Sequence, residues 1–216
     1  MFEVSVVSFG VAPGIFMMVM IVLGVDYSAL IDLKLTNSVA DTQKYFVFNQ
    51  IMAWFASLSY DVNNSFNASI KFLPFTALII PFFSMFRLAK FNIDTRQSES
   101  FIGLPTPANT IFFTSFPLLI SYYYNAGVES NVLNQVLTPW VLIAITLIMS
   151  LLLIAELPLF SLKFKHFKWK GNEIKFIFLG CCLILIPILF AWAIPIIIIL
   201  YLILSVIENK RKKHAA

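Results

Sequence analysis

The stretch that decides the fold is Phe176–Ile207, FIFLGCCLILIPILFAWAIPIIIILYLILSVI, which contains no charged residue. An apolar run of about 18 residues or more is typical of a helix that crosses a membrane. This run spans most of two closely joined apolar segments, Ile174–Leu189 and Trp192–Ile207. We expect a tight helical hairpin with its turn near Phe190–Pro195. A single bent helix is the alternative.

The rest of the chain has the same character. The 216 residues are 60% hydrophobic and 12% charged, with a mean hydropathy of +0.88, whereas soluble domains are about 25% charged. The sequence therefore predicts an all-α, polytopic membrane helix bundle, a single integral membrane domain over residues 1–216 with about six transmembrane helices. The first four apolar segments are Val4–Val25, Phe72–Leu88, Pro107–Tyr124 and Pro139–Phe160. No Lys or Arg precedes the first of them, which favours a span over a cleaved signal peptide.

Basic residues are unevenly divided between the two sides of this bundle. With six spans, 12 of the 15 Lys and Arg residues fall on the side of both termini and the 89–106 and 161–173 loops. Loops rich in Lys and Arg remain in the cytoplasm. We therefore expect a multi-pass protein of the bacterial inner membrane, with both termini cytoplasmic and an external loop at about 26–71. In that loop a surface helix is expected, with Trp54 and Tyr60 at headgroup level. The basic pI near 9.1 is explained by this topology, so no nucleic acid partner is expected.

A polar stretch at the cytoplasmic end of the second segment contains the first candidate site. Arg87 and Lys90 are three residues apart, so on a helix they share one face. Two cations at a membrane surface suit a phosphate group. The alternative is ordinary anchoring, in which both side chains extend to the headgroups.

Two further stretches are unusual. Gly103-Leu-Pro105-Thr106-Pro107 predicts a rigid turn before a helix, where Pro107 can occupy the first helical turn. Free N–H groups at such a helix start can hold an anion. Ser8–Gly14 places two glycines and a proline in the first span, which permits a kink or close approach. Glu156, in the fourth segment, is a candidate for function or for pairing with Lys163.

Taken together, Ser8–Gly14, the run Arg87–Asn92 and the turn Gly103–Pro107 resemble the CDP-alcohol phosphatidyltransferases. The resemblance runs along the whole chain and is greatest for the bacterial enzymes of that family that make phosphatidylserine. It implies a helical membrane enzyme that transfers a phosphatidyl group from CDP-diacylglycerol to L-serine and releases CMP. The implied substrate-binding residues are Ser8, Arg87, Lys90, Asn92, Arg96, Gly103, Pro105 and Thr106.

The chain departs from the family at its metal site. In the family, aspartates hold Mg²⁺ or Mn²⁺ against the CDP pyrophosphate, and the last aspartate takes the proton of the attacking hydroxyl. The two last aspartate positions are occupied here by Met1 and Ser5, and neither can replace a carboxylate. We therefore identify no catalytic or metal-binding residue. We expect an N-terminally shortened chain that lacks transferase activity on its own.

The implied partners are CDP-diacylglycerol, L-serine and membrane lipids, and assembly as a homodimer is left open. Another acceptor alcohol, such as glycerol phosphate or inositol phosphate, is the alternative within the same family. Outside enzymes, the alternatives are a non-catalytic membrane subunit and a small transporter. A transporter is disfavoured because polar residues near the middle of the segments are sparse.

Overall fold

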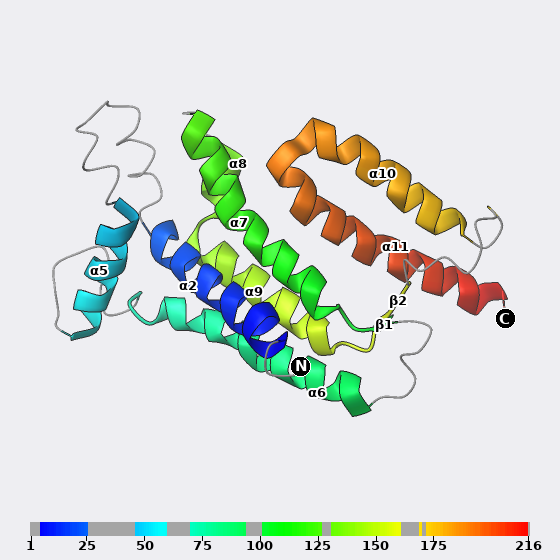
Figure 1. The fold of residues 1–216 in the computed structure, drawn as a ribbon, viewed down its shortest axis with the longest axis horizontal. Coiled ribbons are helices and arrows are strands. Elements are labelled where there is room, and N and C mark those ends of the chain that lie inside the picture. The colour runs from blue at the N-terminus through cyan, green and yellow to red at the C-terminus, as the bar shows by residue number, and fades with distance from the viewer. Residues whose placement is uncertain are drawn as a thin grey trace.

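The computed structural model describes residues 5–25, 46–59, 70–93, 101–126, 131–160, 169 and 172–215. Nearly all of the described residues are helical, which confirms the all-α prediction (Figure 1). The helices are η1 (Val7–Val11), α2 (Ala12–Gly24), α5 (Phe46–Ser59), η2 (Leu73–Leu78), α6 (Ile79–Ile93), α7 (Thr106–Ala126), α8 (Asn131–Val136), α9 (Pro139–Ile154), α10 (Glu173–Leu189), η4 (Phe190–Trp192) and α11 (Ala193–Ala215).

Each of the six apolar segments is helical over most of its length, although the boundaries differ from the prediction. The fourth segment was predicted to run to Phe160, but α9 ends at Ile154 and Ala155 is extended. Pro158 disfavours the predicted continuation to Phe160, because proline has no N–H to donate to the carbonyl of Ile154, four residues earlier. The loop at 125–137 contains a short helix, α8, that was not predicted.

Three helical stretches among the described residues are long and apolar enough to cross a membrane. They are Val7–Gly24, Leu73–Ile93 and Glu173–Arg211, and the shorter apolar helix α9 accompanies them. The third stretch contains α10 and α11, which pack against each other as a hairpin. The chain reverses at η4, where Phe190 has φ 45°. The predicted turn near Phe190–Pro195 is therefore confirmed, and the single bent helix is excluded.

Helices α2, α6, α7 and α9 form the bundle, with the α10–α11 hairpin on one side and α5 at the opposite end (Figure 1). Small residues bring the first two helices together. A Cβ on Gly14 would lie 2.9 Å from Pro81 Cδ, and one on Gly10 would lie 3.1 Å from Ser84 Cβ. The close approach predicted for Ser8–Gly14 is therefore present, because both glycines face α6 or the turn before it.

The segment that was predicted to be external contains the predicted helix, α5, but Trp54 is not on the outer face of this helix. Its indole is 4% exposed, packs with Val22 of α2, and donates a hydrogen bond to the Lys71 carbonyl at 2.8 Å. Trp54 therefore ties α5 to α2. Tyr60 lies outside the described residues.

A two-residue ladder crosses the end of the bundle. Strands β1 (Phe101–Ile102) and β2 (Pro158–Leu159) pair antiparallel, with Phe101 opposite Leu159. The α11 helix is fastened to the same segment, because Tyr201 Oη donates to the Phe160 carbonyl at 3.0 Å and Asn209 Nδ2 donates to the Pro158 carbonyl. The ladder thus joins the bundle to the hairpin.

Candidate functional site

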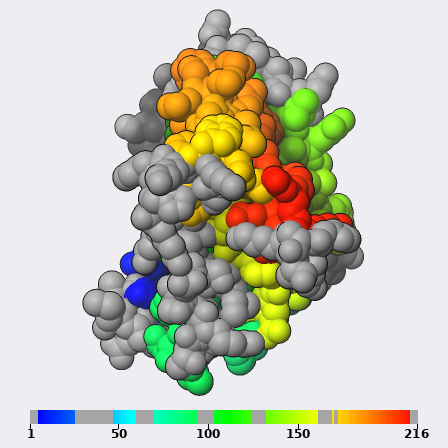
Figure 2. All heavy atoms as spheres, turned by 90° about the vertical axis from the view of Figure 1, so that its right-hand side faces the viewer, coloured from blue at the N-terminus to red at the C-terminus, as the bar shows by residue number. Residues whose placement is uncertain are grey.

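Three segments that are distant in sequence enclose a cavity of about 280 Å³ at the ladder end of the bundle. The start of the first helix supplies Ser5 and Phe9, α6 supplies one wall, and the turn before α7 supplies another. Figure 2 shows this end of the molecule, where the beginning of the described chain and the end of α6 both reach the surface. The lining residues are Ser5, Phe9, Arg87, Leu88, Phe91, Pro105, Thr106 and Pro107. We call this cavity the Arg87 pocket.

The turn that forms one wall depends on Gly103. Its φ is +79°, a conformation that L side chains rarely adopt. A Cβ there would lie 2.7 Å from the Leu153 carbonyl oxygen and 2.8 Å from that of Ala155. The Gly103 N–H donates to Leu157 O at 2.8 Å, and the Leu104 N–H donates to Leu152 O at 2.9 Å. The predicted rigid turn is therefore present, and the end of α9 holds it.

Arg87 is the central charged group of the pocket. It is 3% exposed, its Nε donates to the Leu104 carbonyl at 3.4 Å, and its guanidinium lies 5.6 Å from the ring centroid of Phe91. A guanidinium has five N–H donors in a planar fork that suits phosphate or carboxylate. The Gly103 turn therefore orients the guanidinium through the Leu104 carbonyl.

The start of α7 adds polar groups beside this guanidinium. Thr106 is 5% exposed and begins the helix, and the Asn109 N–H donates to the Pro105 carbonyl at 3.1 Å. Pro107 stands in the first turn, as predicted, where its missing N–H costs nothing. The pocket thus places a helix start, where anions are favoured, next to a buried cation.

A π-helical turn shapes the third wall. In an α-helix the Phe9 carbonyl would accept from residue 13, but Pro13 has no N–H. Two hydroxyls donate to that carbonyl instead, Thr110 Oγ1 at 3.1 Å and Ser84 Oγ at 3.4 Å. Sequence reasoning did not identify Phe9, Ser84 or Thr110. The sequence signal that could have identified them is Pro13. Because Pro13 has no N–H, the Phe9 carbonyl needs another hydrogen-bond donor.

Asn109, on the first turn of α7, was also missed. Its side chain is 0% exposed, and neither its Oδ1 nor its Nδ2 has a hydrogen-bond partner among the described residues. Buried amides are almost always satisfied by protein groups or water. An unsatisfied one therefore marks a place where water or a polar ligand group fits.

The remaining predicted site residues lie elsewhere. Ser8 and Asn92 are exposed and do not line the Arg87 pocket. Lys90 was expected to act with Arg87, but it pairs with Glu156 at 2.9 Å and lines a different cavity. The predicted pairing of Glu156 with Lys163 stays untested, because Lys163 lies outside the described residues. Arg96 and Met1 also lie outside them.

The described part of the pocket does not suit a divalent metal. Mg²⁺ and Mn²⁺ are held by oxygen ligands, mainly carboxylates. The polar side chains here are two hydroxyls and one guanidinium. No group of three or more His, Cys, Asp or Glu side chains gathers in the described part of the chain. Any metal would need ligands from outside these residues.

Neither the scan against models of protein families nor the search of curated proteins found a match to this chain.

Proposed function

We propose that this chain is a six-span bacterial inner-membrane protein with cytoplasmic termini, and that its Arg87 pocket binds the phosphate of CDP-diacylglycerol. It belongs, on this proposal, to the CDP-alcohol phosphatidyltransferases that make phosphatidylserine. In that reaction the serine hydroxyl oxygen attacks the phosphorus next to diacylglycerol. The pyrophosphate bond breaks, CMP leaves, and the hydroxyl proton passes to a base.

The observation that carries the proposal is the gathering of Ser5, Arg87 and the Pro105–Pro107 turn around one cavity. The family resemblance rests on the same three segments, and Ser5 stands where the family has its last aspartate. The pocket has a cationic and hydroxyl-bearing interior and an apolar rim of Phe9, Leu88 and Phe91. Such a lining suits an amphiphile with a phosphate, which is the form of the donor lipid.

Among the alternatives to an enzyme, the chemistry of the pocket favours a non-catalytic subunit over a transporter. Because the described lining contains no carboxylate, neither a metal ligand nor a proton acceptor is supplied there. A non-catalytic subunit that binds the lipid nucleotide is therefore the second candidate. It shares the binding step with the enzyme and lacks the transfer step.

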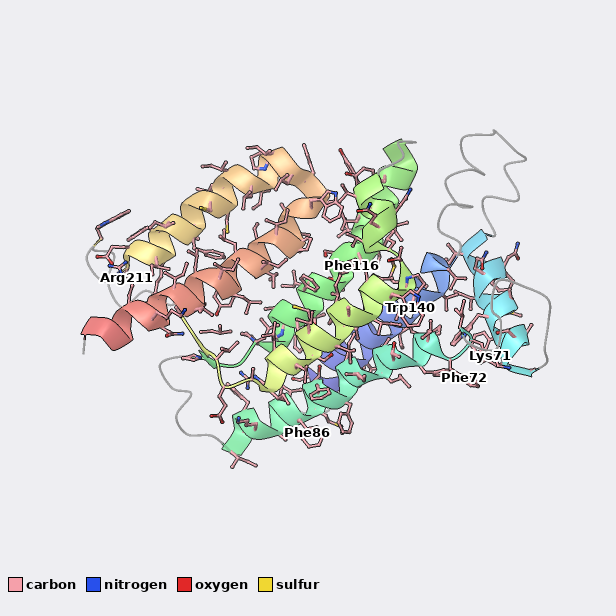
Figure 3. All side chains as sticks on the ribbon, turned by 180° about the vertical axis from the view of Figure 1, so that it is seen from behind. Lys71, Phe72, Phe86, Phe116, Trp140 and Arg211 are labelled. Atoms are coloured by element: carbon pink, nitrogen blue, oxygen red, sulfur yellow. The ribbon has the colours of Figure 1, made fainter. Side chains whose placement is uncertain are left out.

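The binding step is tested by CDP-diacylglycerol titration of the chain in nanodiscs. Arg87→Gln should weaken binding about tenfold or more, because a hydrogen bond to a charged group is lost. The matched control is Arg211→Gln, an exposed arginine at the far end of α11 (Figure 3). Thr106→Val serves as a second pocket variant if Arg87→Gln does not fold. Unchanged affinity in folded pocket variants contradicts the proposal.

The transfer step is tested by CMP release with serine, glycerol phosphate and inositol phosphate, each with Mg²⁺ or Mn²⁺. The chain is compared with a chimera that carries the aspartate signature of a full-length phosphatidyltransferase. Serine-dependent release by the chimera alone supports the enzyme. Binding without release in either protein supports the subunit.

Topology is tested separately by labelling single cysteines placed at residues 40 and 168. Six spans with cytoplasmic termini place these residues on opposite sides of the membrane. Labelling of both from one side contradicts the proposed orientation.

A further inference from the structure

A second cavity lies between α6 and α9, on the outside of the bundle. It has a volume of about 450 Å³ and is lined by Phe82, Phe83, Phe86, Lys90 and Ile154. It shares no lining residue with the Arg87 pocket. We call it the α6–α9 groove.

The groove is apolar along its length and opens away from the bundle. Phe82 is 53% exposed and Phe86 54%, and Figure 3 shows Phe86 on the outer surface of α6. The stretch Leu73–Ile93 that carries them is one of those able to cross a membrane. Phe82 and Lys90 are separated by about 12 Å along the helix. One leaflet of the hydrocarbon core is about 15 Å thick, so the groove matches the upper part of one acyl chain.

Two opposite charges stand side by side at the end of this groove. Lys90 Nζ lies 2.9 Å from Glu156 Oε1, and the two side chains are 37% and 66% exposed. Lys90 is in the last turn of α6 and Glu156 follows the end of α9. A lysine alone would favour any anionic headgroup. The adjacent carboxylate repels a headgroup that is only anionic and attracts one that also carries an ammonium.

We propose that the α6–α9 groove binds a phospholipid whose headgroup carries both a phosphate and a primary ammonium. The phosphate contacts Lys90, the ammonium donates hydrogen bonds to Glu156, and one acyl chain lies along Phe82, Phe86 and Ile154. This site is separate from the proposed phosphatidyltransferase pocket and does not depend on it. It requires only that α6 and α9 lie in a bilayer.

The test is native mass spectrometry of the full chain, released from micelles that hold equal amounts of phosphatidylethanolamine, phosphatidylcholine and phosphatidylglycerol. The wild-type chain should retain phosphatidylethanolamine in preference to the other two. Glu156→Gln should shift the ratio of phosphatidylethanolamine to phosphatidylglycerol about tenfold toward phosphatidylglycerol, because the repelling carboxylate is gone. Lys90→Gln should weaken retention of phosphatidylethanolamine and phosphatidylglycerol alike, because both lipids lose the contact between their phosphate and Lys90.

The double exchange Lys90→Glu with Glu156→Lys is the sharpest variant, because it reverses both charges and keeps the pair. It should restore the preference for phosphatidylethanolamine. Lys210→Gln, an exposed lysine of α11, is the matched control and should change nothing. Ile154→Trp should reduce retention of all three lipids by filling the groove, which provides a readout that leaves the charged pair intact.

Equal retention of the three lipids by the wild-type chain overturns the proposal, as does an unchanged lipid ratio in folded Glu156→Gln. The probe lipids contain no cytidine. A failure to bind CDP-diacylglycerol at Arg87 therefore leaves this result unaffected.

Discussion

The helix bundle and the α10–α11 hairpin are both built from apolar helices, yet they are packed very differently. Within Val7–Gly24, 44% of the most apolar window is buried inside the protein, against 17% within Glu173–Arg211. Helix α2 buries seven residues, whereas α10 buries Ile174 and Phe178. The bundle therefore makes specific contacts, and the hairpin leaves most of its surface to its surroundings.

The difference shows what specifies packing in such a protein. An apolar side chain that faces lipid costs nothing, because lipid tails are as apolar as leucine. Specificity then comes from close backbone approach and from polar groups. The bundle has both, at Gly14 and at Arg87. The polar groups that attach the hairpin to the bundle include Tyr201 Oη, which donates to the Phe160 carbonyl, and Trp192 Nε1, which donates to Tyr123 Oη at 3.0 Å.

The largest expected contrast is between two glycines. Gly103→Ala should lower the free energy of unfolding by about 3 kcal/mol. It would place a side chain on a residue in the left-handed conformation, and the added Cβ would clash with two carbonyl oxygens. Gly180→Ala in α10 meets no atom within 4 Å and should raise the free energy of unfolding by up to about 1 kcal/mol. SDS titration of both variants in mixed micelles measures the two changes. Similar effects at the two sites would remove the distinction between bundle and hairpin.

The next effect concerns helix contact within the bundle. Gly14→Leu should destabilise the protein by about 1–3 kcal/mol, since its side chain would enter the contact with Pro81. Thermal unfolding in micelles measures this. Gly180→Leu is the matched control in the hairpin and should be nearly neutral. A neutral Gly14→Leu would show that α2 and α6 are not in close contact at Pro81.

A smaller effect is expected where the two regions meet. Tyr201→Phe removes the hydrogen bond to the Phe160 carbonyl and should cost about 1 kcal/mol. Amide hydrogen exchange of residues 101–104 should rise with it, because β2 holds β1 in place. Exchange that changes only within α11 would mean that the hairpin does not stabilise the ladder.

The smallest effect is expected on the outer face of the hairpin. Leu183 is 75% exposed, so Leu183→Ala should change the free energy of unfolding by less than about 0.5 kcal/mol. SDS titration of this variant beside Gly180→Ala measures it. A large loss would indicate that a partner covers this face, including a second copy of the chain.

Most of the helices were predictable because the apolar runs that form them are long. The hairpin turn and the Gly103 turn were also predictable from local sequence. The burial of Trp54 was not, because it depends on Val22 and on the Lys71 carbonyl, which are distant in the sequence. The early end of α9 was not predicted, although Pro158 disfavours a helix that continues to Phe160.

For the site, the sequence identified the segments better than the side chains. Lys90 is three residues from Arg87, which on a helix is about 60° of rotation, and that is enough to turn it toward the α6–α9 groove. Asn92 is about 140° from Arg87 and is exposed. Ser8 precedes Phe9 by one residue, so the two point in different directions. Helical spacing places residues within a sector, and the neighbouring helices decide which cavity they enter.

The ladder also has a consequence for the order in which the protein is made. The N–H groups of Gly103 and Leu104 bond to carbonyls of Leu157 and Leu152, which the ribosome adds about 3–10 s later at ordinary elongation rates. Until then the turn cannot leave water without two unsatisfied donors. On the proposed six-span arrangement, nascent α7 enters the bilayer with its first turn still in contact with water. The turn that forms one wall of the Arg87 pocket is complete only after the end of α9 has been made, so assembly of the pocket is a late event in biogenesis.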